Sequence, residues 1–200
     1  TDYKAPQIQK KTLKKLIEKA KNTTFGIDHN FNEIKNHEDF IKRVLVRDYE
    51  QIKKYIDRIK NGELDVLWPG KPKYLAKTSG TTSGVKQIPI TNESMPNHIL
   101  SARNALLFYI YETSKTKFLN GKTIFIQGSP VLNNTNGILE GRLSGIVAYH
   151  VPSYLRKNNL PTLKTNSIED WELKVDRICD ETVNQKMSVI GGIPSWVKMY

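Results

Sequence analysis

The sequence predicts an α/β fold, a sheet flanked by helices, preceded by a helical N-terminal segment. From about residue 63, short apolar runs that end near glycine or proline alternate with stretches of helical periodicity. Residues 1–62 show helical periodicity only. Apolar residues make up 38% of the 200 residues, which is enough for a buried core. We therefore expect a helical segment over residues 1–62 and the start of an α/β domain over residues 63–200.

Three helices are expected in the N-terminal segment. The first covers residues 7–21, and its apolar face consists of Leu13, Leu16, Ile17 and Ala20. A short second helix is expected at residues 37–43. The third follows Asp48, a candidate N-cap, and ends at Asn61-Gly62; its apolar positions are Ile52, Tyr55, Ile56 and Ile59. The lysines between these positions indicate solvated outer faces.

Strands and helices alternate in the remainder of the chain. The strands are expected at 74–77, 87–90, within 122–129, at 145–152 and at 188–190. A long helix from Glu93 to about Ser114 has Ile99, Leu100, Leu106, Leu107 and Ile110 as its apolar positions. Further helices are expected over 168–183 and from Ile193 to Tyr200. The last helix is unfinished, so we expect the sequence to be part of a longer, truncated domain.

Net charge, cysteine content and the lengths of the apolar runs limit the classes of partner and the location that the sequence allows. The formal charge of +11 is spread along the chain rather than gathered in a basic arm, which favours a solvated surface over a nucleic-acid interface. A basic nucleic-acid-binding module stays an alternative of another class. Cys179 alone can form neither an internal disulfide nor a metal cluster, and we expect a buried structural thiol. The absence of a signal-peptide pattern and of a long apolar run predicts a cytoplasmic chain without a membrane span.

One short stretch between two expected strands carries most of the functional information. Residues 78–84 read Thr-Ser-Gly-Thr-Thr-Ser-Gly, and Lys86 follows two residues later. Glycines allow the backbone to approach a phosphate closely, hydroxyl groups add hydrogen-bond donors, and a lysine offsets the negative charge. The spacing fits neither G-x-x-x-x-G-K-[ST] nor G-x-G-x-x-G. We interpret the stretch as a phosphate-binding loop, with an ordinary surface turn as the alternative.

The order of residues in this stretch resembles the phosphate-binding signature of the adenylate-forming enzymes. The wider segment NGELDVLWPGKPKYLAKTSGTTSGVKQIPIT is similar to the acyl-acid amido synthetases, also called the auxin-responsive promoter family, in a bacterial-type form. VRDYEQIKKYIDRI, GILEGRLSGI and GGIPSWVKMY resemble other segments of that family. The resemblance covers most of residues 38–200 and implies the N-terminal part of such an enzyme.

The resemblance implies an ATP- and Mg²⁺-dependent ligase. It would convert a carboxylic acid to an acyl-adenylate and pass the acyl group to an amino acid as an amide. An acyl-CoA or other thioester-forming ligase is the alternative within the superfamily. The family's loop grips the ATP phosphates, which assigns that role here to Thr78, Ser79, Gly80, Thr81, Thr82, Ser83, Gly84 and Lys86. The catalytic residues and the C-terminal lid are expected beyond residue 200, so these residues alone should be inactive.

Assignments for the acyl substrate are less direct. Arg103, in the long helix after the loop, could meet the acid's carboxylate, or it could be an exposed helix arginine. Ser129 and residues 135–141 could line the mouth of the acyl pocket, and ordinary turn chemistry explains them equally well. Trp196 is interpreted as a packed helix start, with a pocket wall as the alternative. His98 and His150 lack partners at ligand spacing, so we expect no metal site built from side chains of this chain.

Overall fold

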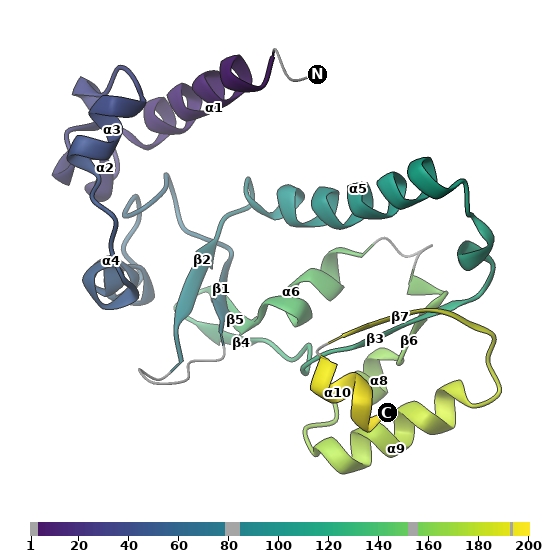
Figure 1. The fold of residues 1–200 in the computed structure, drawn as a ribbon. Coiled ribbons are helices and arrows are strands. Elements are labelled where there is room, and N and C mark those ends of the chain that lie inside the picture. Colours follow the sequence, from purple (N-terminus) through teal and green to yellow (C-terminus); the bar gives the residue numbers. More distant parts are fainter. Residues whose placement is uncertain (1–3, 79–84, 152–155, 193) are drawn as a thin grey trace. The chain divides into compact units, whose positions relative to one another are not determined.

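The computed structural model describes residues 4–78, 85–151, 156–192 and 194–200. The chain divides into two compact units (Figure 1). The first comprises Thr1–Leu75, Ser79–Thr91 and Asn134–Leu139, and the second comprises Ala76–Thr78, Asn92–Asn133 and Glu140–Tyr200. The division expected from the sequence, at residues 62 and 63, stays a prediction.

Three N-terminal helices form where the sequence predicts them, namely α1 (Ala5–Ala20), α3 (His37–Arg43) and α4 (Tyr49–Lys60). The short helix α2 (Thr24–Asp28) and the 3₁₀ helix η2 (Phe31–Glu33) were not expected. Asp48 caps α4 in a reciprocal capping box with Gln51, and Gly62 follows the helix in the left-handed region at φ +92°. The face predicted for the first helix is wrong at one position. Leu16 is exposed, because Phe31 and Ile34 pack against the side of α1 that carries Ile17 and Ala20.

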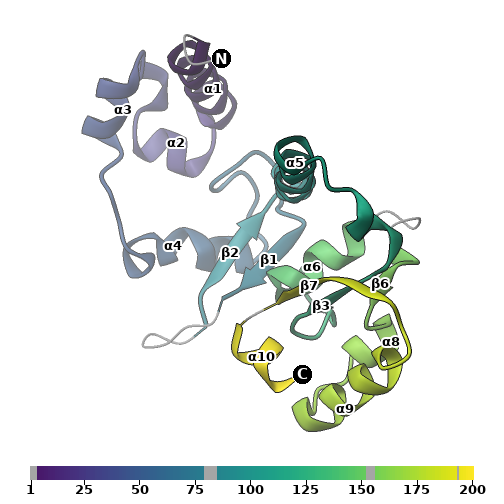
Figure 2. The same cartoon turned by 45° about the vertical axis from the view of Figure 1, so that its right-hand side comes forward.

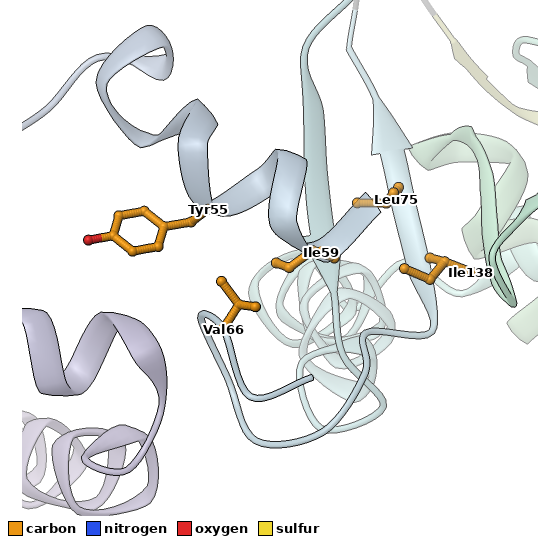
Figure 3. Close-up of a cluster of buried hydrophobic side chains, with 5 residues drawn as sticks. All are labelled: Tyr55, Ile59, Val66, Leu75 and Ile138. Atoms are coloured by element: carbon orange, nitrogen blue, oxygen red, sulfur yellow. The ribbon is translucent and has the colours of Figure 1, made fainter. Parts of the chain in front are cut away.

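A second cluster joins α4 to the first sheet (Figure 3). Its buried side chains are Tyr55, Ile59, Val66, Leu75 and Ile138. Burial of each such side chain contributes on the order of 1.5–3 kcal/mol, so this cluster is a main source of the unit's stability.

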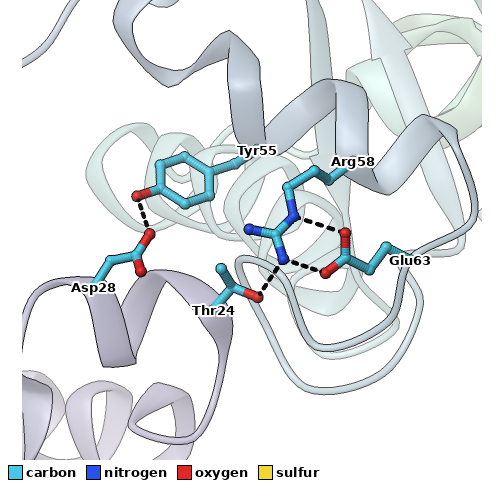
Figure 4. Close-up of polar contacts among 5 residues, drawn as sticks. All are labelled: Thr24, Asp28, Tyr55, Arg58 and Glu63. Carbon is cyan, nitrogen blue, oxygen red and sulfur yellow. Dashed lines mark hydrogen bonds and ion pairs between the residues drawn. The ribbon is translucent and has the colours of Figure 1, made fainter.

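Polar contacts beside this cluster also tie α4 to its neighbours (Figure 4). The Tyr55 hydroxyl donates a hydrogen bond to Asp28 Oδ2 at 2.8 Å. Burial, followed by this hydrogen bond and the charge of Asp28, raises the pKa of Tyr55 to about 12. Arg58 pairs with Glu63, in part through a 2.6 Å hydrogen bond from Nε to Oε2.

The first sheet has four strands in the order β2-β1-β5-β4. The two expected strands β1 (Tyr74–Lys77) and β2 (Gln87–Ile90) are present. The Lys73 N–H, just before β1, donates a 3.1 Å hydrogen bond to the carbonyl of Ile90, the last residue of β2. The start of β1 therefore pairs with the end of β2, and the two strands are antiparallel. Strands β4 (Asn133–Thr135) and β5 (Ile138–Arg142) were not expected. Asn136 and Gly137 connect them with positive φ angles of 52° and 79°, the conformation that an Asn-Gly hairpin turn requires.

The second sheet lies in the second unit and is wholly parallel. Its order is β6-β3-β7, from β3 (Lys122–Ile126), β6 (Asn159–Leu160) and β7 (Met187–Gly192). Figures 1 and 2 show α5 (Met95–Thr113) and α6 (Leu143–His150) on one side of this sheet. On the other side lie α8 (Leu163–Asn166) and α9 (Trp171–Thr182). The chain ends with α10 (Pro194–Met199), and the 3₁₀ helix η3 (Lys117–Asn120) precedes β3. The core here consists of Ile124, Ile126 and Ile178, with Trp171, Met187, Trp196 and Val197 packed against it.

Two expectations for this unit are corrected. Residues 145–152 were expected as a strand, but most of them belong to helix α6. A short apolar run does not distinguish a strand from a buried helix, and Gly145 permits close packing here, since a Cβ would lie 2.8 Å from Pro130 Cα. In α5, the expected core positions Leu100, Leu106 and Leu107 are exposed. Apolar side chains run around this helix, so a single neighbouring element cannot cover them all.

Candidate functional site

The predicted phosphate-binding loop joins two neighbouring strands. Ser79, Gly80, Thr81, Thr82, Ser83 and Gly84 lie outside the described residues. Thr78 follows the last residue of β1 and is exposed, whereas Lys86 precedes the first residue of β2 and is half-buried. Because β1 and β2 pair in antiparallel fashion, the loop is the connection of a hairpin.

Lys86 is held against the start of α4. Its Nζ lies 5.7 Å from the centroid of the Tyr49 ring, a cation–π contact. The Tyr49 hydroxyl also accepts a 2.9 Å hydrogen bond from the Gln87 N–H. At the β1 end, Lys77 forms a 3.5 Å ion pair with Glu140. Residues on either side of the loop are therefore anchored by specific contacts.

The two residues named for the acyl substrate lie in different surroundings. Arg103 is exposed on α5, and its Nη2 donates a 3.3 Å hydrogen bond to the neighbouring Asn104 Oδ1. Ser129 lines a cavity in the second unit, and its hydroxyl oxygen accepts a 3.3 Å hydrogen bond from the Val131 N–H. Arg103 does not belong to that cavity's lining. Among the described residues no group of His, Cys, Asp and Glu side chains is placed to hold a metal ion.

The cavity lies at the carboxyl ends of the parallel strands β3 and β7 and has a volume of about 360 Å³. Its wall comes from the segment after β3, the end of β5, the start of α9 with the residues before it, and α10. The lining residues are Gly128, Ser129, Arg142, Ile168, Glu169, Trp171, Lys174 and Trp196. Ligands of open α/β sheets bind in such crevices at the carboxyl ends of the strands, where the connections that leave neighbouring strands run to opposite faces of the sheet.

Lys174 is the most unusual residue of this wall. Its side chain extends from α9 and only 2% of the residue is exposed. The ammonium group donates hydrogen bonds to the Asn166 carbonyl at 2.6 Å and the Gln127 carbonyl at 3.2 Å. Burial, and secondarily the charge of Arg142, lowers the pKa of Lys174 to about 8. The ammonium group has three N–H bonds, so one is left after these two carbonyls are satisfied.

Arg142 adds a second cation to the cavity wall, and the indoles of Trp171 and Trp196 form its aromatic part. The Arg142 guanidinium lies 6.0 Å from the Trp196 ring centroid, and the Trp171 and Trp196 ring centroids are 4.6 Å apart. Gly128 makes room for the arginine, since a Cβ there would lie 2.2 Å from Arg142 Cδ. Trp196 was one of the residues that the sequence offered as a pocket wall, whereas Arg142, Lys174 and Trp171 carried no signal that singled them out. In the sequence Lys174 is indistinguishable from a solvated helix lysine.

Across the part of the chain that the structure describes, no helix has the length and hydrophobicity needed to cross a membrane. Cys179 is a free thiol in α9 and is half-buried, whereas the sequence predicts a buried structural thiol.

Comparison with known proteins gives one consistent family. The model described as the GH3 family N-terminal domain matches residues 2–167. Indole-3-acetic acid-amido synthetase GH3.15 of Arabidopsis thaliana is 31% identical over 154 residues, which are 66% of this chain and 26% of that protein. Jasmonoyl–L-amino acid synthetase JAR4 of Nicotiana attenuata is 26% identical over 140 residues, covering 68% of this chain and 24% of the relative.

Solved structures agree with the sequence relatives. The GH3.15 acyl acid amido synthetase superposes with a TM-score of 0.67 at 25% identity, over 82% of this chain and 29% of that chain. The AtGH3.15 acyl acid amido synthetase in complex with 2,4-DB gives a TM-score of 0.64 at 26% identity, over 74% of this chain and 26% of that one. The chain thus spans about a quarter of the length of the proteins it matches.

Proposed function

The chain belongs to the GH3 family, and from this membership we propose that the whole protein is an ATP-dependent acyl acid amido synthetase. In the first half-reaction a carboxylate oxygen attacks the α-phosphorus of ATP, which forms an acyl-adenylate and releases pyrophosphate. In the second, the amine of an amino acid attacks the activated carbonyl, which forms an amide and releases AMP and a proton. We place this reaction in the cytoplasm, where ATP and free amino acids are supplied.

The observation that carries the proposal is the family match over a segment that contains the hydroxyl- and glycine-rich loop. Thr78 and the residues up to Gly84 would donate hydroxyl and backbone N–H hydrogen bonds to the phosphates of ATP. Lys86, held beside Tyr49, would supply positive charge at the end of the loop. These groups position the triphosphate and stabilise its charge without taking or giving a proton.

Magnesium is part of the proposal as the ion that accompanies the triphosphate. It would neutralise phosphate charge when bound. The described residues offer no cluster of carboxylates or histidines for it, so we assign it no ligand within them and derive no step through it.

Pyrophosphate–ATP exchange in the full-length protein tests the first half-reaction, because it requires the carboxylic acid and no amino acid. We expect Thr81→Ala and Thr82→Ala each to lower the exchange rate about 10- to 100-fold, as loss of a hydrogen bond to a charged group costs about 1.5–3 kcal/mol. Thr12→Ala, at an exposed position of α1, is the matched control. Full exchange in both loop variants would contradict the proposed phosphate contacts.

The acceptor distinguishes this enzyme from a thioester-forming relative. We expect the acyl-adenylate to give an amide with an amino acid and no thioester with coenzyme A. Product analysis by mass spectrometry with both acceptors present decides between the two, and a thioester product would replace the proposed function by that of an acyl-CoA ligase.

A further inference from the structure

We propose that the lysine-rich outer face of α1 binds the surface of a membrane that contains anionic lipids, with the helix lying on that surface. The inference goes beyond the proposed function and does not rest on it, because it concerns where the protein is held and not which reaction it catalyses. It is carried by the charge, the exposure and the spacing of the residues of α1.

The positive charge of the N-terminal segment is concentrated on one helix. Residues 4–21 contain seven lysines and one glutamate, a net charge of +6, whereas residues 22–62 contain eight basic and seven acidic residues. The glutamate, Glu18, already pairs with Lys21 at 2.5 Å. The charge that is spread out when averaged over the sequence is therefore gathered, in this segment, on α1 and its two flanking residues.

Most of these lysines lie on the outer side of α1. The inner side carries Ile17 and Ala20, which pack against Phe31 and Ile34. Five lysines are exposed and form no ion pair with any other residue that the structure describes. They are Lys4, Lys10, Lys11, Lys14 and Lys15. Lysine side chains are almost never buried without a partner, so we expect this face to stay open to solvent in the full-length protein as well.

An exposed apolar side chain lies within the same face. Ile8 is 60% exposed, and it comes four residues after Lys4 and three residues before Lys11, so the three lie on one side of the helix. In water an isoleucine between ammonium groups contributes no burial. At a bilayer it can enter the boundary between headgroups and acyl chains, while the lysines reach the lipid phosphates with their flexible stems.

The composition of the helix favours lipid over nucleic acid. Residues 4–21 contain no arginine and no aromatic residue. Arginine supplies the bidentate contacts to phosphate and to base edges, and aromatic rings stack on unpaired bases, so both are typical of nucleic-acid interfaces. A basic amphipathic helix is typical of membrane surfaces, where each lysine strengthens binding to anionic lipid about fivefold. No described helix can cross a membrane, so the contact would be peripheral.

Sedimentation of the full-length protein with lipid vesicles tests the proposal without requiring catalysis. The vesicles consist of phosphatidylcholine alone or with about one third phosphatidylglycerol, at about 0.05 M and 0.5 M salt. One variant combines Lys11→Gln with Lys15→Gln. The matched control combines Lys53→Gln with Lys54→Gln, which removes the same charge from exposed positions of α4. Glutamine and lysine have similar helix propensities, and circular dichroism checks that each variant folds.

We expect the wild type to bind the anionic vesicles and not the neutral ones, and to bind at least tenfold more weakly at high salt. The pair at Lys11 and Lys15 should weaken binding about 10- to 30-fold, and the control pair less than threefold. Ile8→Gln should weaken it about fivefold, because the apolar contact is lost. The proposal is overturned if anionic vesicles are not bound, if both lysine pairs weaken binding equally, or if Ile8→Gln binds as the wild type does.

Two further measurements separate this proposal from its alternatives. If the vesicles are not bound, but duplex DNA or polyuridylate is bound with the same dependence on Lys11 and Lys15, the face is a nucleic-acid site and the lipid assignment is wrong. Pyrophosphate–ATP exchange in solution should be equal in the wild type and in the variant with both substitutions on α1. Failure of the proposed function is thus distinguishable from failure of membrane binding.

Discussion

Replacement of Lys174 by methionine provides a direct test of the buried ammonium group. The pKa of this lysine is about 8 in the folded chain, against an ordinary value of 10.5. Between these two values the unfolded chain binds more protons than the folded one, so the free energy of unfolding rises with pH across this window. Below pH 8 the lysine is charged in both states, and the full penalty of burying that charge is present.

The magnitude follows from the size of the pKa difference. Each pKa unit corresponds to about 1.4 kcal/mol, so the whole window is worth about 3 kcal/mol, of which about 2.5 kcal/mol falls between pH 7 and pH 10. Lys174→Met has no ammonium group and lacks this contribution. At pH 7 it also leaves the carbonyls of Gln127 and Asn166 without their donor, at about 1–3 kcal/mol each, which opposes the gain from removing the charge.

Urea denaturation at pH 7, 8, 9 and 10 measures this effect. We expect the free energy of unfolding of the wild type, relative to Lys174→Met, to increase by about 2–3 kcal/mol from pH 7 to pH 10. Lys164→Met, which removes an exposed lysine of α8, should run parallel to the wild type over the same range. A constant difference between the wild type and Lys174→Met would refute the reasoning that Lys174 is buried with its charge uncompensated.

Three further substitutions test the packing of the first unit by urea denaturation at pH 7. Leu75→Ala removes a side chain with no exposed surface from the cluster of Figure 3. It should lower the free energy of unfolding by about 2–5 kcal/mol, and a loss below about 1 kcal/mol would contradict that packing. Tyr55→Phe removes the hydrogen bond to Asp28, which is exposed and can be solvated by water instead. The free energy of unfolding should fall by about 1 kcal/mol, and an unchanged stability would exclude that contact. Gly26→Ala would place a Cβ 2.1 Å from the carbonyl oxygen of Ala20. The free energy of unfolding should fall by about 1–3 kcal/mol or more. A neutral effect would show that α2 lies farther from α1.

Local signals in the sequence were sufficient for three of the N-terminal helices and for the strands β1 and β2. Asp48 and Gln51 lie three residues apart and satisfy each other's backbone donors, and Asn61-Gly62 ends the same helix, because such capping depends only on nearby residues. The Asn136-Gly137 turn was also readable in principle, yet its strands are short and polar and were missed. The family and the candidate phosphate loop likewise came from residue order, and the contacts of the loop with ATP stay a prediction.

Residue order in one dimension predicted the helices α1, α3, α4, α5 and α9, the segment that joins β1 to β2, and the family to which the chain is related. Tertiary packing alone decided that residues 143–150 coil into a helix, that Leu16 and Leu106 remain exposed, and that Lys174 becomes buried beside Arg142. The physical reason is that capping and turn chemistry act between neighbours along the chain. Burial and electrostatic coupling, in contrast, depend on which distant segments come together. Arg142 and Lys174 lie 32 positions apart in the sequence, and only the return of the chain through α9 places both in one cavity wall.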